Sequence, residues 1–481
     1  MSKIKVIKNF FLNYKNSDKI FKATIWFVLV TIIDNCISII TQPFVNRILS
    51  VEQVGVYNVF FTWTTLFRIV ATFNLFCGVY EVLLVDQKEE QEHVRESLCL
   101  LSIILTCIFF GIIFVFISPI STLLQLKFEY LIVMFFMVLS EMIIQFYVVQ
   151  LRFNYQYIRY SVFVVTLFLL KSVLTVLFSH LFVTERALGR MLGLLVPSFL
   201  VAMVLLVIML RKLSLKGITK YWKQSLKFNL PLIPHYLSSV VLASSDKLMI
   251  RSLSSEYYVG LYSVVYSYAN LSQIIFTAIN NSYTPWAYEA IRQKKYSALK
   301  LKTNMILLVS VLFCVLMMLL APEGILILGS EKYLKALNIV PVLILGAFLS
   351  SFYFVFSNVE FINKKTKLVF PITILGAGIN IVLNGILIPI FGYEMAAYTT
   401  VIGYAIIAAC HYIYSYKIVK EHIFDLRFIL FMILLLVGGC IGCIWLYKIH
   451  FLIRYFIAVC FGLFSLRLMI KFVWQGESSL Q

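Results

Sequence analysis

Charged residues are scarce in this sequence, and their scarcity excludes most classes of protein. Asp, Glu, Lys and Arg make up 13% of the chain, whereas hydrophobic residues make up 61%. A soluble domain carries roughly a quarter charged residues, so a soluble globular fold is excluded. Apolar runs of about 20 residues recur from end to end, and each can cross a hydrocarbon core of roughly 30 Å. Because unpaired backbone groups are not tolerated in lipid, these runs must be helices.

Acidic residues are the scarcer of the two charged kinds. The chain has 22 Asp and Glu against 41 Lys and Arg, which gives a formal net charge of +19. A basic chain can bind nucleic acid, but most of these Lys and Arg fall in the loops on one side of the predicted spans. That bias is the positive-inside rule of membrane proteins. We therefore expect attraction to anionic membrane lipid and no nucleic-acid partner.

Motifs that carry enzyme or metal chemistry are also missing from the sequence. It has no Gly-rich nucleotide loop and no His/Cys metal cluster. Its one CxxC, Cys440 to Cys443, lacks the second pair or nearby His that a zinc site needs. The longest predicted outside loop, residues 322–337, contains no Asp-x-Asp. We predict that the protein is not an enzyme and has no cofactor, and we leave open whether protons or sodium ions drive it.

What the chain does have is a series of predicted transmembrane helices. We predict an all-α polytopic membrane protein with about 14 spans of sufficient length and both termini in the cytoplasm. The predicted helices cover residues 24–44, 57–84, 98–118, 129–149, 161–182, 191–210, 229–250, 259–283, 303–321, 338–360, 368–390, 395–416, 428–447 and 450–470. Pro231 and Pro234 are expected to break or bend the seventh of them.

Short matches between the two halves of the chain indicate an internal repeat. Gly55-Val56-Tyr57, at the start of the second predicted helix, returns as Gly260-Leu261-Tyr262 at the eighth. Leu170-Lys171-Ser172 in the fifth helix corresponds to Ile379-Asn380-Ile381 in the eleventh, at nearly the same spacing. Each copy holds an even number of helices, so the two copies are parallel. Repeats of this kind usually place a substrate site between the halves, which predicts a transporter.

The repeat divides the chain into five predicted parts. Two six-helix lobes cover residues 24–210 and 228–417, and a basic cytoplasmic linker, residues 211–227, joins them. A basic segment, residues 1–23, precedes the first lobe and is expected to lie at the membrane interface. Residues 418–481 add two extra helices and a cytoplasmic tail.

Three segments of the second half resemble a known family. They are Phe228-Asn229-Leu230-Pro231-Leu232-Ile233-Pro234, Ser245-Asp246-Lys247-Leu248 and Asn380-Ile381-Val382-Leu383-Asn384. These segments are similar to those of the Wzx-type polysaccharide flippases (O-antigen or capsule repeat-unit flippases) of the multidrug/oligosaccharidyl-lipid/polysaccharide exporter superfamily. Glu394-Met395 stands where that family often has Gly before an Ala pair, a departure that leaves the fold assignment standing.

The resemblance implies a fold, a cargo and a location. It implies two six-helix lobes around a central cavity with alternating access. The implied cargo is a polyprenyl-diphosphate-linked oligosaccharide, which moves from the cytoplasmic to the outer leaflet for capsule, O-antigen or a related cell-surface polysaccharide. The implied location is the bacterial cytoplasmic (inner or plasma) membrane, with contact to polysaccharide assembly proteins. The two extra helices favour a lipid-linked cargo over a drug.

Polar residues within the predicted spans are the candidate functional residues. A charge at the centre of a transmembrane helix costs about 2.5–3.5 kcal/mol on insertion scales, so it needs a function or a partner. A diphosphate needs cationic donors, and the candidate substrate-binding residues are Arg68 and Lys171 with their repeat equivalents Gln273 and Asn380. The candidate coupling or gating residues are Asp34, Glu141 and Asp246. The alternative for each charge is a structural ion pair, and Lys171 is placed opposite Glu141 as one such pair.

Two other functions compete with flipping of a lipid-linked sugar. A drug or cation antiporter of the same superfamily carries cationic cargo and should have an acid-rich cavity, whereas this chain places Arg68 and Lys171 in its spans. A membrane polysaccharide polymerase or glycosyltransferase usually carries a large external loop or acidic catalytic pairs, and neither is evident here. The flippase is therefore the favoured prediction.

Overall fold

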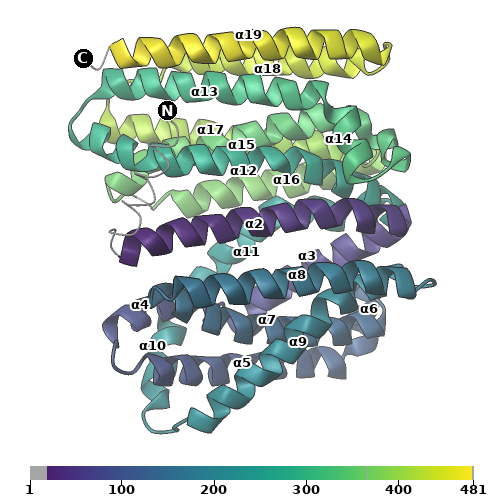
Figure 1. Cartoon of the computed structure of the whole chain (residues 1–481), viewed down its shortest axis with the longest axis vertical. Coiled ribbons are helices and arrows are strands. Elements are labelled where there is room, and N and C mark those ends of the chain that lie inside the picture. The colour runs from purple at the N-terminus through teal and green to yellow at the C-terminus, as the bar shows by residue number, and fades with distance from the viewer. Residues whose placement is uncertain (1–18, 366, 479–481) are drawn as a thin grey trace, which may run out of the picture. The chain divides into compact units, whose positions relative to one another are not determined.

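The computed structural model describes residues 19–365 and 367–478, and every regular element in these ranges is a helix (Figure 1). Within the same ranges, 11 helices are long and apolar enough to cross a membrane. These findings confirm the predicted all-α, polytopic membrane class. The chain forms two compact units, of which the first ends at Leu237 and the second begins at Ser238.

Long helices separated by short turns make up the first unit. Its elements are α2 (Lys19–Ile48), α3 (Val51–Thr72), α4 (Val79–Asp86), α5 (Gln91–Val115), α6 (Ile117–Leu124), α7 (Phe128–Phe153), α8 (Tyr157–Leu181), α9 (Arg186–Lys212), α10 (Ile218–Asn229) and the 3-10 turn η1 (Leu230–Leu232). Helix α11 (Ile233–Leu253) begins in the first unit and ends in the second.

The second unit follows the same plan and ends with two additional helices. Its elements are α12 (Glu256–Arg292), α13 (Tyr296–Leu319), α14 (Ala321–Leu328), the 3-10 helix η2 (Glu331–Ile339), α15 (Val340–Ile362), α16 (Val369–Phe391), α17 (Met395–Val419), α18 (Leu426–Leu446) and α19 (Phe451–Ser478). The additional helices α18 and α19 lie beside α13 (Figure 1).

One predicted helix, residues 57–84, is wrong as a single span. Helix α3 ends at Thr72, and the chain turns before α4 begins at Val79. Phe73 and Asn74 adopt left-handed backbone angles, with φ of 48° and 53°, which end an α-helix. The side chain of Asn229 holds this turn: its Nδ2 donates to the carbonyls of Phe73 at 3.1 Å and Asn74 at 3.0 Å. A contact from so distant a residue leaves no local signal in the sequence.

Two segments predicted as loops contain helices. The predicted outside loop, residues 322–337, holds α14 and η2. The predicted linker, residues 211–227, holds most of α10, which packs on α4 and α5 within the first unit. Trp222 of α10 donates its indole N–H to the Ser97 carbonyl at 2.9 Å. Burial and a hydrogen bond to Glu90 raise the pKa of Tyr221 to about 12, so this phenol stays neutral.

The prolines of the seventh predicted helix interrupt it, as expected. Pro231 lies in η1, between the end of α10 and the start of α11, and Pro234 lies in the first turn of α11. Proline lacks a backbone N–H and is tolerated at the start of a helix. The interruption therefore falls where the chain passes from the linker helix to the helix that carries Asp246.

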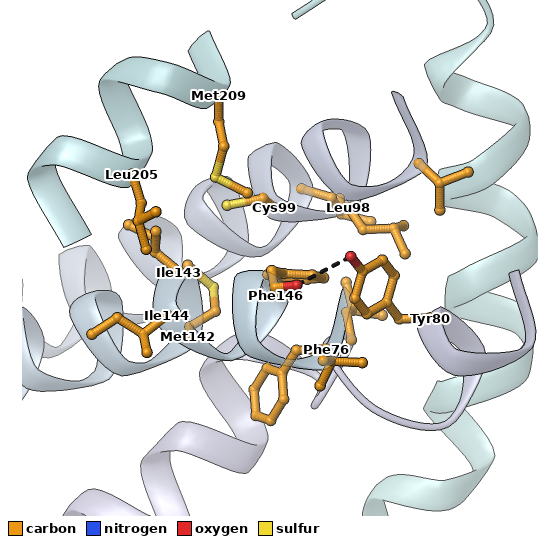
Figure 2. Packing of buried hydrophobic residues seen from close by; sticks show 14 of the residues in the cluster. Phe76, Tyr80, Leu98, Cys99, Met142, Ile143, Ile144, Phe146, Leu205 and Met209 are labelled. Atoms are coloured by element: carbon orange, nitrogen blue, oxygen red, sulfur yellow. Dashed lines mark hydrogen bonds between the residues drawn. The ribbon is translucent and has the colours of Figure 1, made fainter. Parts of the chain in front are cut away.

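The core of the first unit is aromatic at its centre. Phe146 of α7 lies between Phe76 and Tyr80, with ring centroids 6.2 Å and 5.0 Å away (Figure 2). The hydroxyl of Tyr80 donates to the Phe146 carbonyl at 3.1 Å, so this phenol is fully buried without an unpaired polar group. Leu98 of α5 and Leu205 of α9 belong to the same cluster. The cluster thus fixes α7, which carries Glu141.

Two glycines let α9 lie directly against α8. A Cβ atom on Gly193 would lie 2.4 Å from the Thr175 Cα, and one on Gly189 would lie 2.3 Å from the Phe178 carbonyl oxygen. Small residues four apart are the usual means by which membrane helices approach this closely. The contact sets the register of α8, which carries Lys171, against α9, which carries Arg190.

Candidate functional site

A cluster of charged side chains occupies the membrane helices of the first unit. Arg68 of α3 donates from Nη1 to the Glu141 carboxylate of α7 at 3.3 Å. Lys171 of α8 places its Nζ 3.9 Å from the other Glu141 oxygen. The predicted Lys171–Glu141 proximity is confirmed, and Arg68 is the nearer partner. The exposed fractions of the Arg68, Lys171 and Glu141 side chains are 31%, 14% and 24%, so the three are only partly buried within the unit.

Two further charged residues extend this cluster. Arg190 of α9 lies over the ring of Tyr57 of α3, with its guanidinium carbon 3.6 Å from the ring centroid. Asp34 of α2 is half-buried and lies within range of the Lys171 charge. Arg68, Lys171 and Arg190 thus provide three cations against the two carboxylates of Asp34 and Glu141. With Arg190 counted, these five residues of the first unit's membrane helices include one more cation than carboxylate, a balance that favours an anionic ligand.

Arg190 is a residue that the sequence prediction missed. It was assigned to an outside loop, one residue before the predicted helix at 191–210, whereas α9 begins at Arg186. The boundary of a predicted helix is uncertain by about one turn, and Arg190 lies in the first turns of α9 that the prediction left out. The signal that could have found it is the repeat, which aligns Ala187 with Ala396 and therefore Arg190 with Thr399.

The second unit holds a buried network in which the charge is negative. Asp246 of α11 accepts hydrogen bonds from Tyr262 at 2.7 Å, Asn384 at 2.8 Å and Thr400 at 2.7 Å. Asp246 retains 3% of its exposure and Asn384 retains none. A buried carboxylate without a cation requires donors of this kind. No ion pair within 4.0 Å involves Asp246 among the described residues, so these three donors stabilise the acid in the membrane.

Asn380 belongs to the same network. Its Nδ2 donates to Thr400 Oγ1 at 3.2 Å, and its Oδ1 accepts from Ser245 at 3.2 Å and from Asn384 at 3.2 Å. Asn380 is fully buried in the second unit. Its role as a substrate ligand stays a prediction. The carboxylate, amide and hydroxyl oxygens gathered around Asp246 are hard donors that suit a proton or an alkali cation.

Gln273 has the place in the second unit that Arg68 has in the first. Its Nε2 donates to Ser350 Oγ at 2.6 Å and to the Ala347 carbonyl at 3.0 Å, which joins α12 to α15. Arg68 joins α3 to α7 through Glu141 in the same way. The repeat thus preserves a polar contact between corresponding helices, with ions in the first unit and neutral groups in the second.

Comparison with known proteins places the chain in a family. A family model described as polysaccharide biosynthesis protein matches residues 20–291. The chain belongs to this polysaccharide biosynthesis protein family. A second family model, MatE, matches residues 231–386. Among curated proteins, protein 1 of the Lsg locus of Haemophilus influenzae is 32% identical over 157 residues. That match covers 31% of this chain and 38% of the relative.

Solved structures share the fold at low sequence identity. The lipid II flippase MurJ in an inward closed conformation is 16% identical, with a TM-score of 0.63 over 94% of this chain and 99% of that one. An inward-facing multidrug resistance MATE family transporter of the MOP superfamily is also 16% identical, with a TM-score of 0.60 over 83% of this chain and 98% of that one. Family and fold together confirm the predicted place of this family member in the exporter superfamily.

Proposed function

We propose that this polysaccharide biosynthesis family member flips a polyprenyl-diphosphate-linked oligosaccharide from the cytoplasmic to the outer leaflet of a bacterial cytoplasmic membrane. The observation that carries the proposal is the positive cluster of Arg68, Lys171 and Arg190 within the membrane helices of the first unit. An anionic headgroup is the natural ligand of several cations held at one place. The fold shared with a lipid II flippase supports a lipid-linked cargo, and no catalytic role is proposed.

The diphosphate is the part of this cargo that the cluster would bind. Arg68 presents a planar guanidinium that can donate two parallel hydrogen bonds to phosphate oxygens, and Lys171 adds a point charge. Glu141 occupies both cations in the structure described here. Binding of the diphosphate would therefore displace a carboxylate from cations that are already in position. Because one anion replaces another, Arg68 and Lys171 keep an anionic partner, which limits the free-energy cost of holding their charges in the membrane.

Asp246 is proposed as the coupling residue of the second unit. Its carboxylate lies in a shell of hydroxyl and amide groups rather than against a cation. Uptake of a proton or a sodium ion there would neutralise the carboxylate and alter its bonds to α12, α16 and α17. Such a change couples ion binding to helix packing. Asp34 and Glu141 are the proposed gating carboxylates of the first unit.

Antiport of a cationic drug is the second candidate function. The MatE match over residues 231–386 and the shared fold of a multidrug transporter favour it. The cations Arg68, Lys171 and Arg190 argue against it, because a cationic cargo would be repelled from the first unit. The two functions predict opposite charge preferences for the ligand.

Reconstituted protein tests the proposed function directly. The probe is a short polyprenyl-diphosphate oligosaccharide in liposomes, whose exposure in the outer leaflet is followed by a non-permeant glycosidase or lectin. We expect flipping by the wild type and loss of flipping in Arg68→Ala and Lys171→Ala. Arg152→Ala is the matched control, since Arg152 pairs with Glu81 on an exposed surface of the same unit. Transport of a cationic dye instead of the diphosphate lipid would establish the antiporter.

A further inference from the structure

Glu360 and His411 form a fully buried ionisable pair in the second unit. The His411 Nδ1 lies 2.6 Å from the Glu360 Oε1, and neither side chain is exposed. Glu360 comes from α15 and His411 from α17. Among the described residues, no hydrogen bond joins this pair to the network around Asp246. It is therefore a second, separate titratable site in the unit.

The pair lies among apolar and aromatic side chains. The Tyr353 ring meets the His411 imidazole edge-on, with centroids 5.1 Å apart. Val359 and Ile407 are buried on the same two helices. A net charge in such surroundings is costly. A Glu–His pair is neutral when it holds one proton, whichever atom carries it, and it is charged when it holds none or two. The surroundings therefore favour a single shared proton.

The remaining polar atom of each side chain has no partner. Glu360 Oε2 and His411 Nε2 are both buried, and neither makes a hydrogen bond within the part of the chain that the structure describes. With one proton shared between Nδ1 and Oε1, the imidazole Nε2–H lacks an acceptor and Oε2 lacks a donor. Buried groups of this kind are rarely left unpaired. Both atoms would gain partners if water entered between α15 and α17.

Charged groups on the neighbouring elements are engaged elsewhere. Tyr353 of α15 contacts the pair through its ring. Among the described residues, no hydrogen bond or ion pair joins a titratable side chain of α12, α13, α18 or η2 to Glu360 or His411. Titratable groups on these elements contact other residues: Tyr283 contacts Thr303, Lys300 contacts Asp425, and Lys302 lies over Trp286. Glu360 and His411 are therefore each other's polar partners in this part of the unit.

The pair is close to one end of α15. Glu360 precedes the last residue, Ile362, by two positions, or about 3 Å along the helix. The exposed Asn363, Lys364 and Lys365 follow the helix. A small separation of α15 from α17 at this end would open a short path from the pair to water.

We propose that Glu360 and His411 form a proton-binding site that holds one proton while α15 and α17 are closed and exchanges it with water when they separate at this end. On opening, the proton leaves the pair for water and returns before the helices close, so no other reactant is needed. The site supplies a proton step distinct from any ion bound at Asp246. It concerns proton binding between α15 and α17, and it holds or fails independently of the cargo.

Infrared difference spectroscopy of the full-length protein in liposomes tests the site without any cargo. Spectra between acidic and alkaline pH report protonation of carboxyl and imidazole groups. We expect one reversible titration of carboxyl and imidazole bands that is lost together in Glu360→Gln and in His411→Gln. Glu331→Gln is the matched control, an exposed glutamate of the same unit, and should keep the bands. Identical difference spectra in the wild type and both pair variants would overturn the proposal.

Conservative variants cover the case in which a pair variant fails to fold. Glu360→Asp retains the acid and shifts its carbonyl band, so a shifted band that still titrates with the imidazole supports the site. An unshifted spectrum in a folded Glu360→Asp protein would overturn it. A positive spectroscopic result with no flipping activity would leave the proton site standing and refute the proposed function alone.

Discussion

Glu141 of α7 accepts a hydrogen bond from Arg68 of α3 at 3.3 Å and lies 3.9 Å from Lys171 of α8. One carboxylate therefore serves two cations from different helices. In the second unit the corresponding α12–α15 contact is neutral, from Gln273 to Ser350 at 2.6 Å. Since the neutral contact suffices to hold a helix pair together, the charges of the first unit exceed what packing requires. That excess is the structural argument for function at Arg68.

Arg68→Gln tests this argument with the residue that the second unit uses. A glutamine keeps a donor for Glu141 and removes the charge, so the protein should fold while flipping falls by at least about tenfold, the equivalent of about 1.4 kcal/mol. Flipping and protein abundance are measured together. Arg152→Gln is the control. Unchanged flipping in a well-expressed Arg68→Gln protein would return Arg68 to a structural role.

Asp246→Asn tests coupling in the second unit. Asparagine retains the shape but offers an N–H₂ group where Asn384 and Thr400 now donate to a carboxylate. We expect flipping to lose its response to a pH or sodium gradient, measured by imposing each gradient in turn. Ser252→Ala is the control, because Ser252 is exposed on the same helix and donates to the Met249 carbonyl of its own turn. A gradient response that survives in Asp246→Asn would remove Asp246 from the coupling step.

Gly193→Ala tests the close approach of α8 and α9. A Cβ there would lie 2.4 Å from the Thr175 Cα, so the helices must move apart. We expect a lower thermal unfolding temperature and weaker flipping, because Lys171 moves with α8. Gly111→Ala is the matched control: its Cβ would meet nothing within 4 Å, and alanine is favoured over glycine by about 1 kcal/mol in a helix. Equal stability of the two variants would contradict the packing argument.

Sequence reasoning reached the all-α, polytopic class because membrane spans leave a strong, local signal in composition. It also brought Lys171 and Glu141 to the same depth, because adjacent antiparallel helices fix depth from residue number. It failed where a contact between residues far apart in the sequence determines the local structure. The break after Thr72 depends on Asn229, and the pairing of Glu360 with His411 depends on which helices touch. Neither relation has a local pattern.

The α3–α4 turn offers a test of one such distant contact. Asn229→Ala removes the amide that donates to the Phe73 and Asn74 carbonyls. The Asn74 carbonyl keeps the Cys77 N–H as a donor at 3.1 Å, whereas the Phe73 carbonyl loses the Asn229 amide. A buried acceptor left unpaired costs about 1–3 kcal/mol, so the unfolding temperature should fall. Asn58→Ala is the control, since the Asn58 side chain donates to the Val54 carbonyl of its own helix. If both variants unfold at the same temperature, Asn229 does not hold the turn.

Glu141→Gln tests whether the carboxylate competes with the cargo for Arg68 and Lys171. Removing the negative charge frees both cations while an amide of the same shape stays between them. If Glu141 is a competing anion, the purified variant should bind a polyprenyl diphosphate lipid more tightly, by at least about threefold or 0.65 kcal/mol. It should also flip the lipid more slowly, because nothing displaces the diphosphate from the cations on release. Glu81→Gln is the matched control, a glutamate paired with Arg152 on the surface of the same unit.

If Glu141 is instead a permanent structural partner, Glu141→Gln should lower the unfolding temperature and weaken lipid binding together. Tighter binding with slower release therefore supports a switchable ion pair, and weaker binding with lost stability refutes it.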